Sequence, residues 1–242
     1  MKIGVLASGG GSNLQSIINA CQHDYIPESK VTLVISNKKD AYALERARKH
    51  NIESIWIRPP LNMKKLQKGG DLDEILADPV RQEYDSQIKK TLLDFHIDVL
   101  CMAGYMLFVT PILLDNWDVI NIHPALLPAF AGMHGVQDAW DYGTRVIGCT
   151  THFADNKMDH GPIILQATTP VFPGEDPKVL GDRNLRREHL IYPESLRLYQ
   201  QGLLKRKGRK VTIEWDEAHY WFHQQLLELW RNDFHDYYNS RQ

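Results

Sequence analysis

The first hundred residues alternate between short apolar runs and segments whose apolar residues recur at helical spacing. Short apolar runs predict strands, and the helical spacing predicts amphipathic helices between them. The predicted strands are residues 3–7, 31–35, 52–57 and 99–103, and the predicted helices are residues 14–21, 41–50 and 84–95. Apolar strands joined by such helices indicate a parallel sheet that is covered on both faces.

The second half of the chain predicts longer elements. Strands are expected at 146–153 and 163–171, and a helix from about residue 176 to residue 202. The fold class is therefore α/β, with three layers, a mostly parallel sheet and antiparallel additions in the second half. The sheet is expected to bind its ligands at the carboxyl ends of its parallel strands.

The C-terminal forty residues differ in composition from the rest. Residues 204–210 are mostly basic and predict a solvated turn that leads into a strand at 211–215. Aromatic residues then recur with a helical rhythm through 216–242. This tail predicts a helix that packs on the body of the protein or on another subunit, so a homodimer is one expected assembly.

Composition narrows the class of protein. The chain has 242 residues, 24% of them charged, and a formal net charge of −2. That balance provides no cationic surface for nucleic acid or an anionic membrane, and no segment approaches the length of a membrane span. The three cysteines (Cys21, Cys101 and Cys149) lie far apart, and their spacing and odd number fit neither a metal site nor a full set of disulfides. The N-terminus also lacks the apolar core of a signal peptide. We therefore expect a protein of the reducing cytoplasm that uses no metal.

An amide and an imidazole stand two residues apart at the end of an apolar run. Side chains on a strand alternate between its faces, so Asn121 and His123 share one face while the isoleucines between and before them face the packing. Pro124 ends the strand because it cannot donate to the ladder. Two polar groups at a strand end form the floor of an active site, or, alternatively, cap a strand with the imidazole bonded to a nearby carbonyl.

A glycine-rich loop, Ser8-Gly-Gly-Gly-Ser-Asn13, joins the first predicted strand to the first helix. Glycines let the backbone approach a ligand, and the free N–H groups at a helix start favour an anion such as phosphate. Ser12 or Asn13 is expected to cap that helix. The loop has neither the lysine of a Walker A sequence nor the third glycine of a dinucleotide fingerprint. We therefore expect it to hold a phosphate monoester, the alternative being a simple strand–helix turn.

A second polar loop, Asn156-Lys-Met-Asp-His-Gly-Pro162, carries Asp159 between two predicted strands. If it folds over the end of the Asn121–His123 strand, its carboxylate favours the protonated form of a neighbouring imidazole. An amide N–H₂ and an imidazolium together suit a developing oxyanion. The chain has no serine or cysteine in a recognisable nucleophile elbow, which favours direct transfer over a covalent intermediate.

Four segments, in this order and spacing, resemble the signature segments of the folate-dependent glycinamide ribonucleotide (GAR) transformylases. They are Ser8-Gly-Gly-Gly-Ser-Asn-Leu-Gln15, Ala103-Gly-Tyr-Met106, Asn121-Ile-His-Pro-Ala-Leu-Leu-Pro128 and Met158-Asp-His-Gly-Pro-Ile-Ile-Leu-Gln166. The resemblance implies a Rossmann-like formyltransferase domain over residues 1–213, with a phosphate-binding first half (about 1–105) and a catalytic, folate-binding second half (about 106–213). Residues 214–242 would form a helical extension.

The resemblance also implies a reaction and a role for each matching residue. The formyl group of 10-formyltetrahydrofolate, a co-substrate, would pass to the primary amine of GAR. Asn121 and His123 would bind and protonate the tetrahedral oxyanion, and Asp159 would favour protonated His123 and help move the amine's proton. The remaining roles fall into three groups: Gly11, Ser12 and Asn13 for the phosphate; Glu188 for the ribose or glycinamide part; and Arg81, Met106, Leu107, Phe108, Val109 and Asn121 for the folate.

The chain departs from the family pattern at several places. Leu107 stands where relatives often carry a basic residue, and Gly135-Val136 replaces the usual second histidine after His134. An insertion over residues 60–78 precedes Arg81 and weakens its alignment, and the aromatic tail has no expected counterpart. The nearest alternative function is a 10-formyltetrahydrofolate hydrolase, in which water is the acceptor. A methionyl-tRNA formyltransferase would need a basic C-terminal domain, and a non-catalytic binding module would need no oxyanion stabiliser.

Overall fold

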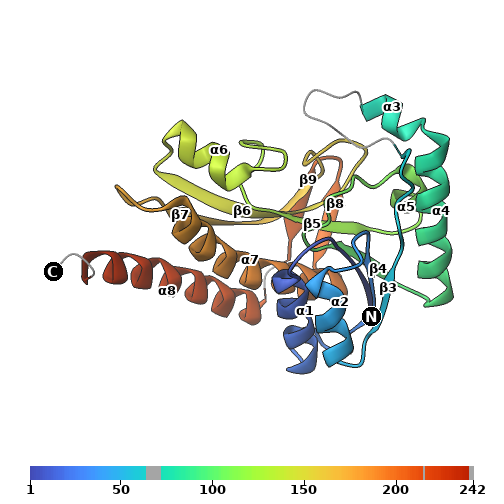
Figure 1. The fold of residues 1–242 in the computed structure, drawn as a ribbon. Helices are drawn as coiled ribbons and strands as arrows, with labels where there is room; N and C mark the ends of the chain where they lie inside the picture. The colour runs from blue at the N-terminus through green and yellow to red at the C-terminus, as the bar shows by residue number, and fades with distance from the viewer. Residues whose placement is uncertain (64–71, 215, 240–242) are drawn as a thin grey trace. The chain divides into compact units, whose positions relative to one another are not determined.

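The structure is a computed structural model that describes residues 1–63, 72–214 and 216–239 (Figure 1). The chain divides into two compact units. The first unit comprises Met1–Asn121 and Phe153–Gly161, and the second comprises Ile122–His152 and Pro162–Gln242.

The first unit alternates strands and helices, as the apolar pattern predicts. Its elements are β1 (Lys2–Ala7), α1 (Ser12–Gln22), β2 (Lys30–Ser36), α2 (Tyr42–Lys49), β3 (Glu53–Trp56), α3 (Leu72–Leu76), α4 (Pro79–Asp94), β4 (Val99–Met102), α5 (Pro111–Leu114) and β5 (Val119–His123). The strands are parallel in the order β3-β2-β1-β4-β5. Strand β5 continues into the second unit, whose first residue is Ile122.

The core of the first unit forms where α4 packs on the sheet. Ile88 and Leu92 of this helix are fully buried together with Leu6, Leu33 and Leu100 of the strands. Burying each of these side chains stabilises the unit by about 1.5–3 kcal/mol. The helix begins at Pro79, earlier than the predicted start at residue 84, because the Asp78 carboxylate accepts a hydrogen bond from the Val80 N–H and proline occupies the first turn.

The second unit adds the antiparallel part of the fold. Its elements are α6 (Gly135–Tyr142), β6 (Val146–Phe153, of which the last residue belongs to the first unit), β7 (Ile163–Pro170), α7 (Pro177–Gln200), β8 (Leu204–Lys207), β9 (Lys210–Ile213) and α8 (Glu217–Asn239). Strands β6 and β7 pair antiparallel, and the whole sheet runs β3-β2-β1-β4-β5-β6-β7. The predicted fold class, a mostly parallel sheet with antiparallel additions, is confirmed.

The basic segment 204–210 is not the simple solvated turn that its composition predicts. Its first half is strand β8, which pairs antiparallel with β9 in a separate two-stranded sheet. The turn between them contains Gly208 in the left-handed region, with φ of 60°. The turn residue, rather than an alternation of apolar side chains, determines a hairpin of this kind. The basic composition of residues 204–210 therefore gave no sign of a strand.

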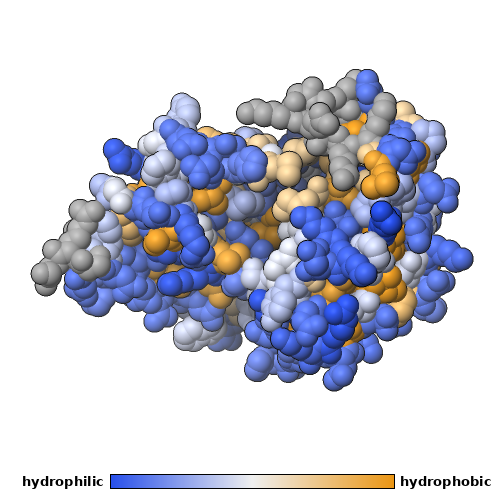
Figure 2. All heavy atoms as spheres, in the orientation of Figure 1, coloured by the Kyte–Doolittle hydropathy of each residue, from blue (hydrophilic) through white to orange (hydrophobic). Residues whose placement is uncertain are grey.

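The aromatic tail is helical, as predicted, and α8 packs against α7 and β7 in the second unit (Figure 1). Residues 64–71 of the predicted insertion, and Trp215 of the strand predicted at 211–215, lie outside the described residues. Hydrophilic residues predominate on the face drawn in Figure 2, and apolar residues show through in scattered groups. No helix in the described part of the chain has the length and apolar character needed to cross a membrane.

Candidate active site

Strand β5 ends at His123, immediately before Pro124, as the sequence predicts. Ile120 and Ile122 are buried, whereas Asn121 on the opposite face of the strand is only partly buried. The alternation of a strand thus leaves the Asn121 amide accessible at the carboxyl edge of the parallel strands. In sheets of this type, that edge is where ligands bind.

The loop that carries Asp159 is anchored beside β5. The Ala154 N–H donates to the Val119 carbonyl oxygen at 2.7 Å, and Asp159 adopts a left-handed backbone with φ of 47°. Gly161 packs so closely that an added Cβ would lie 1.7 Å from the Phe153 carbonyl oxygen. The result is that Asn121 Nδ2 donates to Asp159 Oδ1 at 3.4 Å. The structure therefore places the Asp159 carboxylate against the Asn121 amide, whereas the sequence predicts it beside the imidazole of His123.

His123 is buried in the second unit and held by a backbone carbonyl. Its Nε2 lies 2.9 Å from the carbonyl oxygen of Phe130, a residue with φ of 52°. Because a carbonyl oxygen only accepts hydrogen bonds, Nε2 carries a hydrogen in both charge states of the ring. Gly135 makes room for this arrangement, since a Cβ there would lie 3.2 Å from His123 Nε2.

The glycine loop packs closely against α2 at Gly11. Gly11 has φ of 69°, and a Cβ on it would lie 2.8 Å from the Cα of Ala43. The predicted side-chain cap is wrong, however. Gly11 itself is the N-cap of α1 and no side chain caps the helix, because a left-handed glycine turns the chain into the helix before Ser12 or Asn13 reaches the capping position. The N–H groups at the start of α1 are thus not used by a side-chain cap.

Ser8 joins three loops at the carboxyl edge of the first unit. Its buried hydroxyl donates to Asn37 Oδ1 at 2.7 Å and accepts from the Met106 N–H at 2.8 Å. Its own N–H donates to the Gly104 carbonyl oxygen at 3.1 Å. One serine therefore connects the glycine loop to the segment that follows β2 and to the segment that follows β4.

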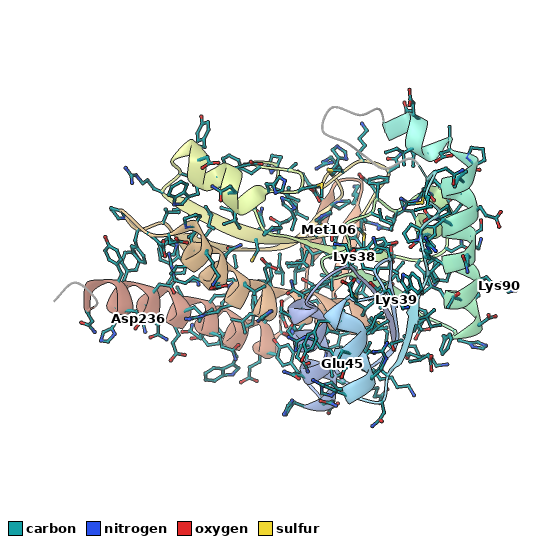
Figure 3. All side chains as sticks on the ribbon, in the orientation of Figure 1. Lys38, Lys39, Glu45, Lys90, Met106 and Asp236 are labelled. Carbon is teal, nitrogen blue, oxygen red and sulfur yellow. The ribbon has the colours of Figure 1, made fainter. Side chains whose placement is uncertain are left out.

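The residues predicted to line a folate pocket lie in two settings. Met106 is 52% exposed, while Leu107 and Val109 are buried, and Figure 3 labels Met106. Phe108 is partly buried. Arg81 is only 1% exposed, and its Nε donates to Asp85 Oδ1 at 3.2 Å.

The setting of Arg81 is a buried polar cluster within the first unit. Asp85 also accepts a hydrogen bond from the Thr110 N–H at 3.3 Å, so it connects α4 to the end of the Met106–Val109 segment. Arg81 Nη2 has no hydrogen-bond partner in the part of the chain that the structure describes. Burial also raises the pKa of the nearby Tyr105 phenol well above its ordinary value, so this hydroxyl stays neutral.

Glu188 lies in the middle of α7, in the second unit, and is largely buried. Burial is the main cause that raises the pKa of the Cys149 thiol on β6, and the negative charge of Glu188 adds to it. Asn184, one helical turn before Glu188, donates through Nδ2 to the Gly148 carbonyl oxygen of β6 at 3.0 Å, so Glu188 lies on the side of α7 that faces β6. The preceding residue, Arg187, donates through Nε to the Thr168 carbonyl oxygen of β7 at 3.0 Å.

The predicted site residues thus fall into two groups. The glycine loop, Arg81, the Met106–Val109 segment, Asn121 and Asp159 belong to the first unit, and His123 and Glu188 belong to the second. Sequence reasoning missed Asn37 and Asp85, and it gave Ser8 no role of its own. The only available signal was that Ser8 and Asn37 each follow the carboxyl end of a predicted parallel strand. Within the described residues, no group of three or more His, Cys, Asp or Glu side chains is arranged to hold a metal ion.

Comparison with known proteins agrees with this geometry. Residues 1–196 match the model of the formyl transferase family. The chain is 35% identical over 216 residues to the phosphoribosylglycinamide formyltransferase of Haemophilus influenzae, covering 88% of this chain and 93% of that protein. It is 34% identical over 217 residues to the trifunctional purine biosynthetic protein adenosine-3 of Chironomus tentans, of which it spans 15%. The glycinamide ribonucleotide transformylase 1 of Symbiobacterium toebii superimposes with a TM-score of 0.78 at 40% identity, covering 88% of this chain and 93% of that one.

Proposed function

The chain belongs to the formyl transferase family, and on this premise we propose that it is a phosphoribosylglycinamide formyltransferase. It transfers the formyl group of 10-formyltetrahydrofolate to the primary amine of GAR, a step of purine biosynthesis. The observation that carries the proposal is the approach of Asn121 Nδ2 to Asp159 Oδ1 at 3.4 Å, at the end of the strand that also carries His123.

The reaction proceeds by direct attack of the amine. The GAR nitrogen forms a bond to the formyl carbon, and the carbonyl π electrons move onto the oxygen. Asn121 Nδ2–H and protonated His123, acting through Nδ1, stabilise the oxyanion. Asp159 helps move the amine's proton through water to N10 of the folate. The oxyanion's electron pair then re-forms the carbonyl as the bond between N10 and the formyl carbon breaks, with its electrons going to N10. The products are formylglycinamide ribonucleotide and tetrahydrofolate.

The phosphate of GAR binds at Gly11, Ser12 and Asn13. The left-handed Gly11 and its close packing against α2 support this assignment, because they fix the loop that presents the N–H groups of α1. The positive end of the helix dipole adds an attraction for the dianion. The loop holds this anion without a lysine, unlike a Walker A loop.

The remaining assignments concern the ends of the two substrates. Glu188 contacts the ribose or glycinamide part of GAR, for which a carboxylate is a suitable acceptor. The exposed Met106 and the residues after it, together with Asn121, line the folate site. Arg81 contributes to the same pocket, supported by the Nη2 donor that has no partner among the described residues. Asp85 orients this guanidinium through its Nε.

We also propose a reducing compartment, the cytoplasm, because the three cysteines lie far apart in the sequence and Cys101 and Cys149 are buried. A homodimer remains a proposal that the exposed Tyr220 and Trp221 of α8 support. Light scattering of the purified protein tests it, and a molar mass of one chain would contradict it.

A folate assay run with and without GAR tests the proposed function. Tetrahydrofolate that appears only when GAR is present supports the transferase. Equal production without GAR would make water the acceptor and the protein a hydrolase, and folate binding with no product would leave a binding module. Asp159→Asn keeps the shape of the side chain but removes its charge, so it serves as the inactive control.

A further inference from the structure

The aromatic tail lies beyond the residues that match the family model, which ends at residue 196. It is nevertheless fastened to the second unit by specific contacts. Trp230 Nε1 of α8 donates to both the carbonyl oxygen and the hydroxyl of Thr168 on β7, at 2.9 and 3.0 Å. Phe172, just after β7, stacks on Tyr237 with ring centroids 4.2 Å apart. The tail is therefore part of the packed structure of this unit.

The centre of this contact is a buried charge cluster. Asp233 of α8 is only 2% exposed and accepts hydrogen bonds from Arg183 Nη1, at 3.0 Å, and from Arg187 Nη2. Arg183 also binds Glu175 at 2.6 Å. Two guanidinium groups thus face two carboxylates. Removing the charge of Asp233 would leave an excess positive charge in the interior, which is costly.

Arg187 is the member of the cluster that immediately precedes Glu188, the residue assigned to GAR. Its Nε donates to the Thr168 carbonyl oxygen, its Nη1 donates to the Arg183 carbonyl oxygen at 3.0 Å, and its Nη2 binds Asp233. Thr168 accepts from Trp230 at the same carbonyl. All three guanidinium nitrogens are therefore engaged, and the turn of α7 at residue 187 is held between β7 and α8.

Glu188 follows Arg187 directly and lies one helical turn after Asn184, which donates to the Gly148 carbonyl oxygen of β6 at 3.0 Å. Its backbone position depends on the same contacts. We propose that α8, acting through Asp233 and Arg187, is a positioning element for Glu188 on the GAR side of the active site. This inference rests on the proposed function. It gives the tail a role in substrate binding in addition to packing.

The inference predicts a selective kinetic effect of Asp233→Asn. The asparagine is close in shape but leaves Arg183 and Arg187 without their shared charge. A small displacement of a substrate-positioning residue weakens binding strongly, so we expect the KM for GAR to rise by at least about 10-fold. The KM for 10-formyltetrahydrofolate stays near that of the parent protein, because the residues assigned to folate lie in the first unit.

Asp236→Asn is the matched control. Asp236, labelled in Figure 3, lies one turn further along α8 and its side chain is 74% exposed. We expect it to leave both KM values unchanged. Asp233→Glu, which keeps the charge, is expected to recover much of the GAR affinity that Asp233→Asn loses.

The result that overturns the inference is a folded Asp233→Asn protein with a lower urea midpoint but an unchanged KM for GAR, since the tail would then only stabilise the fold. An equal rise in both KM values would also overturn it. If Asp233→Asn does not fold, Trp230→Phe, which removes only the bonds to Thr168, takes its place with the same readout. A parent protein with no GAR-dependent turnover would instead refute the proposed function.

Discussion

At the scale of single residues, the first prediction concerns the side-chain N–H₂ of Asn121, which is proposed to donate to the oxyanion. Asn121→Ala removes the proposed donor to the oxyanion together with the hydrogen bond to Asp159 Oδ1, and it leaves no buried cavity because the side chain is only partly buried. Loss of one such donor lowers kcat by about 10²–10³-fold elsewhere, and we expect the same here with little change in either KM. Steady-state kinetics measures this directly. Asn116→Ala, at an exposed asparagine, is the matched control, and an unchanged kcat in Asn121→Ala would remove this residue from the mechanism.

Ser8 makes a different prediction, because it contacts loops rather than substrate. Ser8→Ala leaves the Met106 N–H and Asn37 Oδ1 without the hydroxyl that joins them. A buried polar group that loses its partner costs about 1–3 kcal/mol, and the loops relax to recover part of that cost. We expect both KM values to rise together, since the glycine loop and the Met106 segment move apart.

The measurement for Ser8→Ala is therefore whether the KM for GAR and the KM for 10-formyltetrahydrofolate rise together. Ser86→Ala, on the exposed face of α4, removes a serine hydroxyl away from these loops and is expected to change neither. A rise in only one KM for Ser8→Ala would contradict the bridging role and would assign the serine to a single loop.

The sequence predicts some residue-scale features and not others. The sequence predicts the Asp159 carboxylate beside the imidazole of His123, whereas the structure has it accepting from the Asn121 amide. Strand alternation puts Asn121 and His123 on one face, but it does not say which of the two side chains the carboxylate contacts. The Ser8 bridge was not expected, since its partners lie 29 and 98 residues away and serine is common in loops. The predicted cap on α1 was wrong because the left-handed backbone of Gly11 fixes where the helix begins. Side-chain capping preferences do not contain that information.

At the scale of elements, the loop between β6 and β7 depends on Gly161. An alanine there would place its Cβ 1.7 Å from the Phe153 carbonyl oxygen, so the backbone must move. We expect Gly161→Ala to displace Asp159 and to lower kcat strongly. Kinetics and a thermal melt of the same variant separate the loss of activity from a loss of stability.

Gly181→Ala gives the opposite expectation for the same chemical change. Gly181 lies inside α7, and a Cβ there meets only Val136, at 3.9 Å. Replacing glycine by alanine in a helix interior stabilises by about 0.5–1 kcal/mol. A higher melting temperature with normal kcat is expected. Normal activity in Gly161→Ala would show that the position of Asp159 does not depend on this close packing.

Elements with a long apolar period were predictable, and short or polar ones were not. The strand predicted at 146–153 coincides with β6, and the long helix α7 begins after its predicted start at Asp176. The four-residue α5, by contrast, is too short to show a period, and α6 begins with a glycine and includes polar residues. The almost entirely basic side chains of residues 204–207 predict a turn, whereas the structure has strand β8 there.

At the scale of the whole molecule, the net charge of −2 conceals two buried networks of opposite charges in the second unit. One surrounds Asp233. In the other, Arg197 binds both Glu194 and Asp216, and His219 lies 2.5 Å from Glu194. Composition gives only totals, so sequence reasoning could not pair these groups. Both networks join α7 to the segment from Asp216 onward, which makes the attachment of the tail sensitive to charge.

That sensitivity predicts how the stability of the protein depends on acid. The hydrogen bond from Arg197 is the main cause that lowers the pKa of Asp216 below its ordinary value. A carboxyl whose pKa is lower in the folded state contributes stability above its unfolded pKa, near ~3.9, and loses it as the pH falls through the folded value. We therefore expect Asp216→Asn to lower the urea midpoint by a constant amount near neutral pH. Below about pH 4 the midpoints of the variant and the parent should converge. Urea titrations from neutral to acid pH measure both, with the exposed Asp236→Asn as the control. A gap that stays constant into acid would mean that Asp216 acts through packing or the His219 N–H it binds rather than through its charge.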